Sequence, residues 1–142
     1  LYPRSEHRKR LEEAKSFSGK IGMEMISPGE YEKDKWLKFI SGYEGEPEGG
    51  ERCKKCYRFR LRSTASLAAE MNFPYLATTL SISPHKDAEV INLIGHKVSK
   101  ECGVKFLADD FKKNGGFNKS VELSRKYNLY RQDYCGCEFS VK

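Results

Sequence analysis

Four of the five cysteines lie in two close pairs, and this feature of the sequence is the one most able to carry redox or metal chemistry. Cys53 and Cys56 form a CxxC motif, and Cys135 and Cys137 form a CxC motif. Thiolates at such spacings bind zinc or iron–sulfur clusters, and the spacing alone does not choose between them. A zinc ribbon separates its pairs by about 15–20 residues, whereas residues 57–134 lie between these. We therefore expect two distant parts of one fold to form a single centre.

The CxC motif has a second interpretation. Two cysteines separated by one residue can close a small, strained disulfide, and strained disulfides tend to be labile and catalytic. Gly136 gives the backbone the freedom that such a ring needs. Cys135 and Cys137 are therefore either metal ligands or a dithiol that cycles with substrate, and a structural zinc site is the simpler alternative. The lone Cys102 is expected to pack as a small apolar residue.

The first cysteine pair is expected at the start of a helix that runs to about Met71. The loop 42–50 is rich in Gly, Glu and Pro and leads directly into Arg52 and Cys53. A spacing of three residues places both sulfurs on one side of the helix. The positive end of the helix then stabilises negative charge on the sulfurs.

The remaining pattern predicts an α/β fold. Strands alternating with helices favour a parallel sheet with flanking helices in a single domain. The loops 79–87 and 108–116 each follow a strand, so both are expected to face one crevice at the carboxyl edge of the sheet. The expected strands are Met23–Ile26, Tyr75–Leu80 and Val104–Leu107, and the other expected helices are Ser5–Ser18, Glu32–Tyr43, one opened by Ser83 as N-cap, and Lys119–Tyr127.

Composition limits the class of protein. The chain has 142 residues, a net charge of +6 and 38% hydrophobic residues. No apolar run approaches the roughly 20 residues of a membrane span, and we expect a cytoplasmic protein with no membrane partner. The positive charge is compatible with a polyanionic partner such as RNA, and an ordinary solvated surface is the alternative.

Several motifs together resemble the QueH family of epoxyqueuosine reductases. They occur in order over about residues 2–140, and the set is far more specific than any one of them. These motifs are the run Glu46–Cys56 followed by Arg60-Leu61, Thr78-Thr79-Leu80 with Ser83-Pro84-His85-Lys86, Asp110-Phe111-Lys112-Lys113, and the closing run Leu129–Ser140.

The resemblance implies the last step of queuosine biosynthesis, in which the epoxide of epoxyqueuosine in tRNA is reduced to queuosine. It implies a cobalamin-independent iron–sulfur enzyme with a 4Fe-4S cluster and allows a second metal ion nearby. By position, Cys53 and Cys56 match cluster ligands. Cys135 and Cys137 match a C-terminal pair that is read as a redox-active disulfide or as metal-associated thiols. The electron donor and the oligomeric state are not implied.

The sequence departs from the family pattern at its start. Members of the family begin with a strand and an adjacent Cys-Cys motif that supplies the other cluster ligands, and this sequence contains no adjacent cysteines. We expect a truncated copy that lacks about 30–40 residues, the size of one βα unit, including the first strand of the sheet.

Epoxide reduction also needs a proton donor and a grip on tRNA. The candidate acids are Asp110, His85 and Tyr134, since they lie in strand-end loops or beside the thiols. For each of these, a structural or hydrogen-bonding role is the alternative. The tRNA-binding candidates, whose alternatives are a solvated surface or core packing, are Lys86, Lys112, Lys113, Arg131 and Tyr130.

Two other functions fit the cysteines. The first is a non-catalytic RNA-binding module stabilised by zinc. The second is a thiol oxidoreductase that acts on proteins through its CxxC and CxC motifs.

Overall fold

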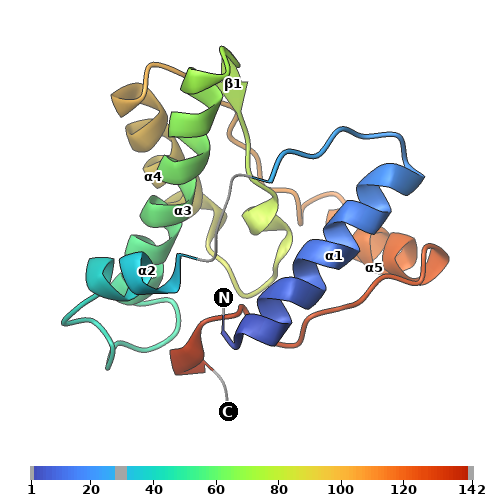
Figure 1. Ribbon diagram of the computed structural model, residues 1–142, viewed down its shortest axis with the longest axis horizontal. Helices are drawn as coiled ribbons and strands as arrows, with labels where there is room; N and C mark the ends of the chain where they lie inside the picture. Colours follow the sequence, from blue (N-terminus) through green and yellow to red (C-terminus); the bar gives the residue numbers. More distant parts are fainter. Residues whose placement is uncertain (1, 28–31, 141–142) are drawn as a thin grey trace. The chain divides into compact units, whose positions relative to one another are not determined.

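The chain folds into two compact units that are interleaved in sequence (Figure 1). The computed structural model describes residues 2–27 and 32–140. Unit 2 is continuous and runs from Asp34 to Lys119, whereas unit 1 combines the segment up to Lys33 with the segment from Ser120 onward. The CxxC motif therefore belongs to unit 2 and the CxC motif to unit 1.

Unit 2 is built on a parallel pair of strands. Strand β1 (Tyr75–Leu76) pairs with β2 (Lys105–Phe106), and Tyr75 is opposite Lys105. The amide of Leu107 extends the ladder by donating to the carbonyl of Leu76 at 2.9 Å. Helix α4 (Ala88–Glu101) connects the two strands. This βαβ arrangement confirms the predicted α/β class and the parallel pairing of the strands.

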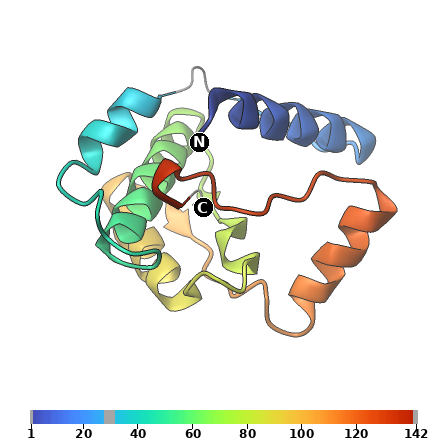
Figure 2. The ribbon, with the colours of Figure 1, turned by 90° about the horizontal axis from the view of Figure 1, so that it is seen from below.

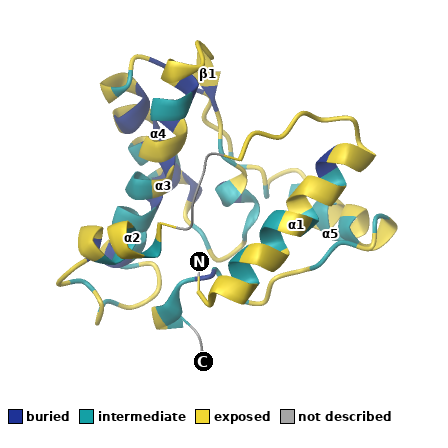
Figure 3. Ribbon diagram, viewed as in Figure 1, coloured by how far each residue is buried: buried dark blue, intermediate teal, exposed yellow. Residues whose placement is uncertain are grey.

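Helices α3 (Glu51–Glu70) and α4 pack against each other and against the strands. Their facing sides carry many of the buried residues of this unit, and the two strands contribute others (Figure 3). Gly95 allows α4 to approach β2 closely, because a Cβ at this position would lie 2.4 Å from the ring of Phe106. The core cluster comprises Tyr57, Leu61, Ala65, Ala68, Leu76, Ile91, Val98, Val104 and Phe106.

The segment between β1 and α4 differs from the sequence prediction. The strand ends at Leu76, and Thr79–Ile82 forms a 3₁₀ turn capped by the Thr78 hydroxyl, which accepts from the amide of Leu80 at 3.3 Å. Asp87, and not Ser83, is the N-cap of α4, since its carboxylate accepts from the amides of Glu89 and Val90. A carboxylate that meets two helix amides is a stronger start signal than the Ser-Pro pair four residues earlier.

Unit 1 contains α1 (Arg4–Lys20), most of α5 (Gly116–Lys126) and the 3₁₀ turn η2 (Glu138–Ser140). Rings on two of its segments meet, with Phe17 and Tyr127 edge to face at 5.2 Å. The described residues 23–26 form no strand, and their apolar side chains are exposed. That strand prediction was therefore wrong.

Helix α2 (Lys33–Phe39) ends earlier than the predicted Tyr43, and the chain turns at Ile40, which is fully buried. Across residues 2–27 and 32–140, no helix combines the length and the apolar character needed to cross a bilayer.

Candidate functional site

The CxxC motif lies in the first two turns of α3, as predicted. The helix starts at Glu51, so Cys53 and Cys56 are one turn apart, and both are half-buried. Cys53 also packs against the edge of the hydrophobic core. The pair is thus anchored on a regular element of unit 2.

A buried arginine holds the loop that precedes this pair. Arg52 is only 2% exposed. Its guanidinium donates to the carbonyl of Glu44 at 2.7 Å and to the carbonyl of Glu46. Because a buried guanidinium is costly unless its donors are bonded, these contacts fix the loop 43–50 against the start of α3.

The same loop donates a hydrogen bond to sulfur. The amide of Gly49 lies 3.3 Å from Sγ of Cys53, and Gly49 adopts a positive φ of 89°. Gly50 leaves little room for a side chain, since a Cβ would lie 2.7 Å from a carboxylate oxygen of Glu46 and 3.1 Å from the carbonyl of Pro47. Amide donors to sulfur are a feature of thiolate metal sites, where they tune the electron density on the ligand.

The CxC motif lies in the extended tail of unit 1, before η2. Gly136 is buried with a positive φ of 90°, and its carbonyl accepts from the amide of Tyr2 at 2.8 Å. The hydroxyl of Ser140 lies 3.2 Å from Sγ of Cys135 and donates to the carbonyl of Cys137 at 2.9 Å. The glycine required by the sequence argument is therefore used in a compact turn that carries both half-buried thiols.

Two tyrosines of the tail are tied to α1. The hydroxyl of Tyr130 donates to Glu6 at 2.9 Å, and the ammonium of Lys9 lies 3.4 Å from the centre of its ring. The hydroxyl of Tyr134 donates to the carbonyl of Tyr2. The hydrogen bond to Glu6 raises the pKa of Tyr130, and burial raises the pKa of Tyr134. Both phenols therefore keep their protons at neutral pH.

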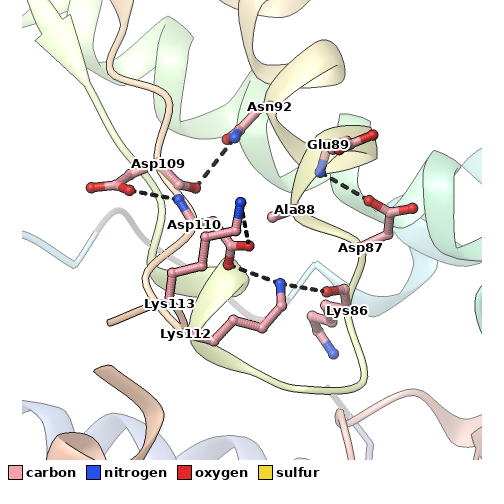
Figure 4. Close-up of a pocket in the computed structure, with 9 residues that line it drawn as sticks. All are labelled: Lys86, Asp87, Ala88, Glu89, Asn92, Asp109, Asp110, Lys112 and Lys113. Atoms are coloured by element: carbon pink, nitrogen blue, oxygen red, sulfur yellow. Dashed lines mark hydrogen bonds and ion pairs between the residues drawn. The ribbon is translucent and has the colours of Figure 1, made fainter. Parts of the chain in front are cut away.

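An open pocket of about 650 Å³ lies in unit 2 (Figure 4). The loop after the 3₁₀ turn η1 (Thr79–Ile82) and the loop after β2 both contribute to its wall, as the sequence predicted for the two strand-end loops. Lys112 joins these loops, since its ammonium donates to Asp110 at 2.8 Å and to the carbonyl of Lys86 at 3.2 Å. The pocket is lined by Lys86, Asp87, Ala88, Glu89, Asn92, Asp109, Asp110, Lys112 and Lys113.

Asp110 is the carboxylate at the centre of the ion pairs in this pocket. The hydrogen bond from Lys112 holds the pKa of Asp110 below its usual value, and this carboxylate is only 16% exposed. The ammonium of Lys113 lies 3.9 Å from Asp110, and its side chain is 75% exposed. A carboxylate held ionised is a poor proton donor, so the pairing counts against Asp110 as the acid.

The other predicted residues lie elsewhere. His85 is exposed and is not among the residues that line the pocket. Its backbone amide donates to the hydroxyl of Ser83 at 3.3 Å. Arg131 is exposed in the tail of unit 1 and donates to the hydroxyl of Ser124 at 3.1 Å. The roles assigned to both residues remain predictions.

The donors of unit 2 fit part of a cluster site. A four-iron cluster takes four thiolates, and Cys53 and Cys56 offer two of them with an amide donor on one sulfur. Among the described residues, no group of three or more His, Cys, Asp or Glu side chains is arranged to hold a metal ion. The prediction that all four cysteines form one centre stays a prediction, since the pairs belong to different units.

Sequence reasoning missed the residues that hold the cysteines in place. No role is predicted for Arg52 from the sequence, although its position directly before Cys53, after a Gly-rich loop, is a usable signal. Glu6 and Arg10 form an i, i+4 ion pair at 2.7 Å on α1, a spacing that can be seen in the sequence. Their contacts with the tail, 124 residues away, leave no local trace.

Comparison with known proteins places these features in a family. A family model described as epoxyqueuosine reductase QueH matches residues 1–142. The curated protein named epoxyqueuosine reductase QueH from Streptococcus pyogenes is 39% identical to this chain, and the match covers all of this chain and 58% of the relative. The protein of the same name from Staphylococcus epidermidis is 37% identical, and the match covers 99% of this chain and 62% of the relative. The Thermotoga maritima protein of that name is 35% identical over 99% of this chain and 74% of the relative. The chain thus spans about three fifths of the length of the first two relatives.

Proposed function

Because the chain belongs to the epoxyqueuosine reductase QueH family, we propose that it reduces the epoxide of epoxyqueuosine in tRNA to give queuosine. The observation that carries the proposal is the match over residues 1–142, which includes both cysteine pairs. A tRNA substrate also points to the cytoplasm as the place of action.

The cysteine pair of unit 1 is proposed as the immediate reductant. Converting an epoxide to an alkene removes one oxygen and takes two electrons. The thiols of Cys135 and Cys137 supply those electrons by forming one disulfide, and their two protons leave with the oxygen as water. A cellular dithiol or another two-electron donor then restores the thiols. The compact turn at Gly136, which carries both sulfurs, supports this assignment.

The cysteine pair of unit 2 is proposed to hold an iron–sulfur cluster. Cys53 and Cys56 would supply two thiolates, and the amide of Gly49 would donate to one of them. A bound cluster supplies iron that can polarise an oxygen atom and store electrons. The proposal allows a second metal ion nearby, as the family resemblance implies.

The proposed proton donor is Tyr134, which gives its proton to the leaving oxygen and regains one from a thiol of the Cys135/Cys137 pair, so the water formed still takes only the two thiol protons. Tyr134 directly precedes Cys135, and its raised pKa keeps the phenol protonated at neutral pH. Asp110 and His85 remain weaker candidates. The exposed Lys113 is the cation of the pocket best suited to a phosphate of tRNA, with Lys86, Lys112, Arg131 and Tyr130 as further candidates.

The proposal is tested by anaerobic reconstitution of the chain with iron and sulfide, followed by turnover of tRNA that carries epoxyqueuosine in the presence of a small dithiol as the reductant. We expect iron-dependent absorbance and formation of queuosine. Cys135→Ser should abolish the product and leave the absorbance largely intact, whereas Cys102→Ser, the same exchange at the lone cysteine, should leave both unchanged.

Other outcomes point elsewhere. Loss of absorbance in Cys135→Ser would make Cys135 a metal ligand. A colourless protein with stoichiometric zinc and no turnover would contradict the proposal and favour the zinc-stabilised RNA-binding module. Efficient reduction of a generic protein disulfide would favour the thiol oxidoreductase.

A further inference from the structure

The tail that carries the CxC motif is held by one face of α1. Figure 2 shows this extended tail, after α5, running alongside the helix. Glu6 and Arg10 lie one turn apart on that face, joined at 2.7 Å, and each side chain is only 13% exposed. A charge pair this well covered is held in one geometry far better than an exposed surface pair.

Each member of this pair also contacts the tail. The Nη2 atom of Arg10 donates to the carbonyl of Tyr134 at 3.0 Å, and its guanidinium lies 5.0 Å from the centre of that ring. Glu6 accepts from the hydroxyl of Tyr130 at 2.9 Å. One helical turn beyond Arg10, Glu13 accepts from the amide of Tyr130 at 2.9 Å.

These contacts fix the backbone where the CxC motif begins. The carbonyl of Tyr134 belongs to the peptide group that joins Tyr134 to Cys135, so the bond from Arg10 sets the orientation of that group. The bond from Tyr2 to the carbonyl of Gly136 fixes the next part of the motif. The two contacts therefore hold the backbone from which the side chains of Cys135 and Cys137 project.

The separation of two thiols governs their redox behaviour. A disulfide forms only within a narrow range of geometry, and a backbone that resists or favours that geometry shifts the equilibrium between dithiol and disulfide. A tail released from α1 would sample many more conformations, and its thiols would also be more open to reagents.

We propose that Glu6 and Arg10 are positioning residues that set the redox equilibrium and the accessibility of the Cys135/Cys137 pair. The inference rests on the proposed redox role of this pair, and it adds two residues that touch neither sulfur in any contact described above. The arginine has two tasks, since its Nε holds Glu6 while its Nη2 holds Tyr134.

The first measurement is the dithiol–disulfide equilibrium of the pair in glutathione buffers, read by mass spectrometry after acid quenching. Arg10→Ala should change the equilibrium constant roughly 3- to 30-fold, the size expected for loss of charge-assisted hydrogen bonds. Arg10→Lys keeps the charge but cannot make both contacts, so it should restore only part of the change. Arg8→Ala is the matched control, because Arg8 is exposed on the same helix.

The second measurement is the rate at which each cysteine is alkylated in the folded protein. Arg10→Ala and Glu6→Gln should speed alkylation of Cys135 and Cys137 several-fold, with Cys102 as the internal reference. The milder Glu6→Gln and Arg10→Lys variants carry the test if Arg10→Ala does not fold.

The two proposals fail in different ways. If both measurements are the same in Arg10→Ala, Glu6→Gln and wild type, the inference about α1 is overturned and the reductase proposal stands. If the wild-type pair forms no reversible disulfide, its redox role is overturned, and the alkylation rates still decide whether α1 positions the tail.

Discussion

At the scale of single residues, the positions that shape unit 2 are those with no spare space. Gly95 on α4 faces the ring of Phe106, and Gly50 is enclosed by Glu46 and Pro47. Arg52 has a comparable role through hydrogen bonds, since its buried guanidinium donates to two carbonyls of the loop before Cys53. Each of these residues brings backbone segments together that other side chains would hold apart.

Gly95→Ala should therefore destabilise the protein. The added methyl would meet three ring atoms of Phe106 at 2.4–2.6 Å, and the ring is enclosed in the core. Overpacking of this kind costs about 1–3 kcal/mol. The free energy of unfolding from chemical denaturation measures the effect.

Gly19→Ala is the matched control for that experiment. Gly19 also lies in a helix, and a Cβ there would meet nothing within 4 Å. Because alanine is the better helix former by about 1 kcal/mol, this variant should be neutral or slightly stabilising. Equal destabilisation by both substitutions would show that the ring of Phe106 is not the cause.

At the scale of elements, Ser83 and Asp87 are the two candidates for the N-cap of α4. The sequence favoured Ser83 with Pro84, whereas the structure uses Asp87. Asp87→Ala should lower the free energy of unfolding by about 1 kcal/mol, since two helix amides lose their acceptor. Ser83→Ala should cost less, because the Ser83 hydroxyl accepts from the amide of His85 in a turn that precedes the helix. Thermal and chemical unfolding of the two variants decide between them, and a larger loss in Ser83→Ala would contradict the assignment.

The contact between α1 and the tail should depend on pH. The hydrogen bond from Arg10 is the main reason that the pKa of Glu6 is lowered, with further help from Tyr130 and Lys9. A lowered folded-state pKa adds stability above the unfolded value near 4.5, and that stability is lost as the pH falls through the folded value. The contribution of Tyr130 to stability depends on pH in the opposite direction. Its pKa is raised mainly by Glu6, so its contribution is present below 10.0 and is lost as the pH rises through the folded value.

Glu6→Gln tests both limits. Wild type should be more stable than this variant near neutral pH. The difference should shrink below pH 4.5 and again above pH 10.0. Unfolding free energies of both proteins across this range provide the measurement, and a difference that does not vary with pH would exclude Glu6 as the titrating group.

Sequence patterns identified the local features of these elements and missed the distant ones. The end of the Gly-rich loop 42–50 predicts the start of a helix at Cys53 and Cys56, and α3 confirms it. The apolar residues of the segment 23–26 predict a strand, but the sequence does not identify a partner strand beside it. Contacts between Glu6 and Tyr130 join residues 124 positions apart, and pattern arguments do not reach that far.

At the scale of the whole molecule, net charge and its placement govern association with a polyanion. The chain carries 26 Lys and Arg against 20 Asp and Glu. In the pocket, however, Lys112 and Lys113 both pair with the carboxylate of Asp110, so the charge counted from the sequence overstates the charge that a phosphate can use. Lys113 extends furthest into solvent among the paired lysines there.

Lys113→Ala should weaken binding of tRNA and reduce the steepness of its salt dependence. Losing one phosphate contact lowers the slope of log K against log salt by about 1. Lys97→Ala, an exposed lysine of α4 that is not among the pocket residues, is the control. Binding measured at several salt concentrations provides the slopes, and equal slopes for both variants would remove Lys113 from the interface.

The interleaving of the units also sets an order of assembly during synthesis. Unit 2 is a continuous stretch, so it can fold as soon as Lys119 has left the ribosome. Unit 1 cannot fold at that stage, because α1 is synthesised before the tail that it packs against. The hydrogen bond from the amide of Tyr2 to the carbonyl of Gly136 is one contact that joins these distant segments. We therefore expect the nascent chain to form the helix of the CxxC motif before the turn of the CxC motif has been synthesised. The two sulfur pairs mature one after the other, and the pair proposed to bind metal is ready first.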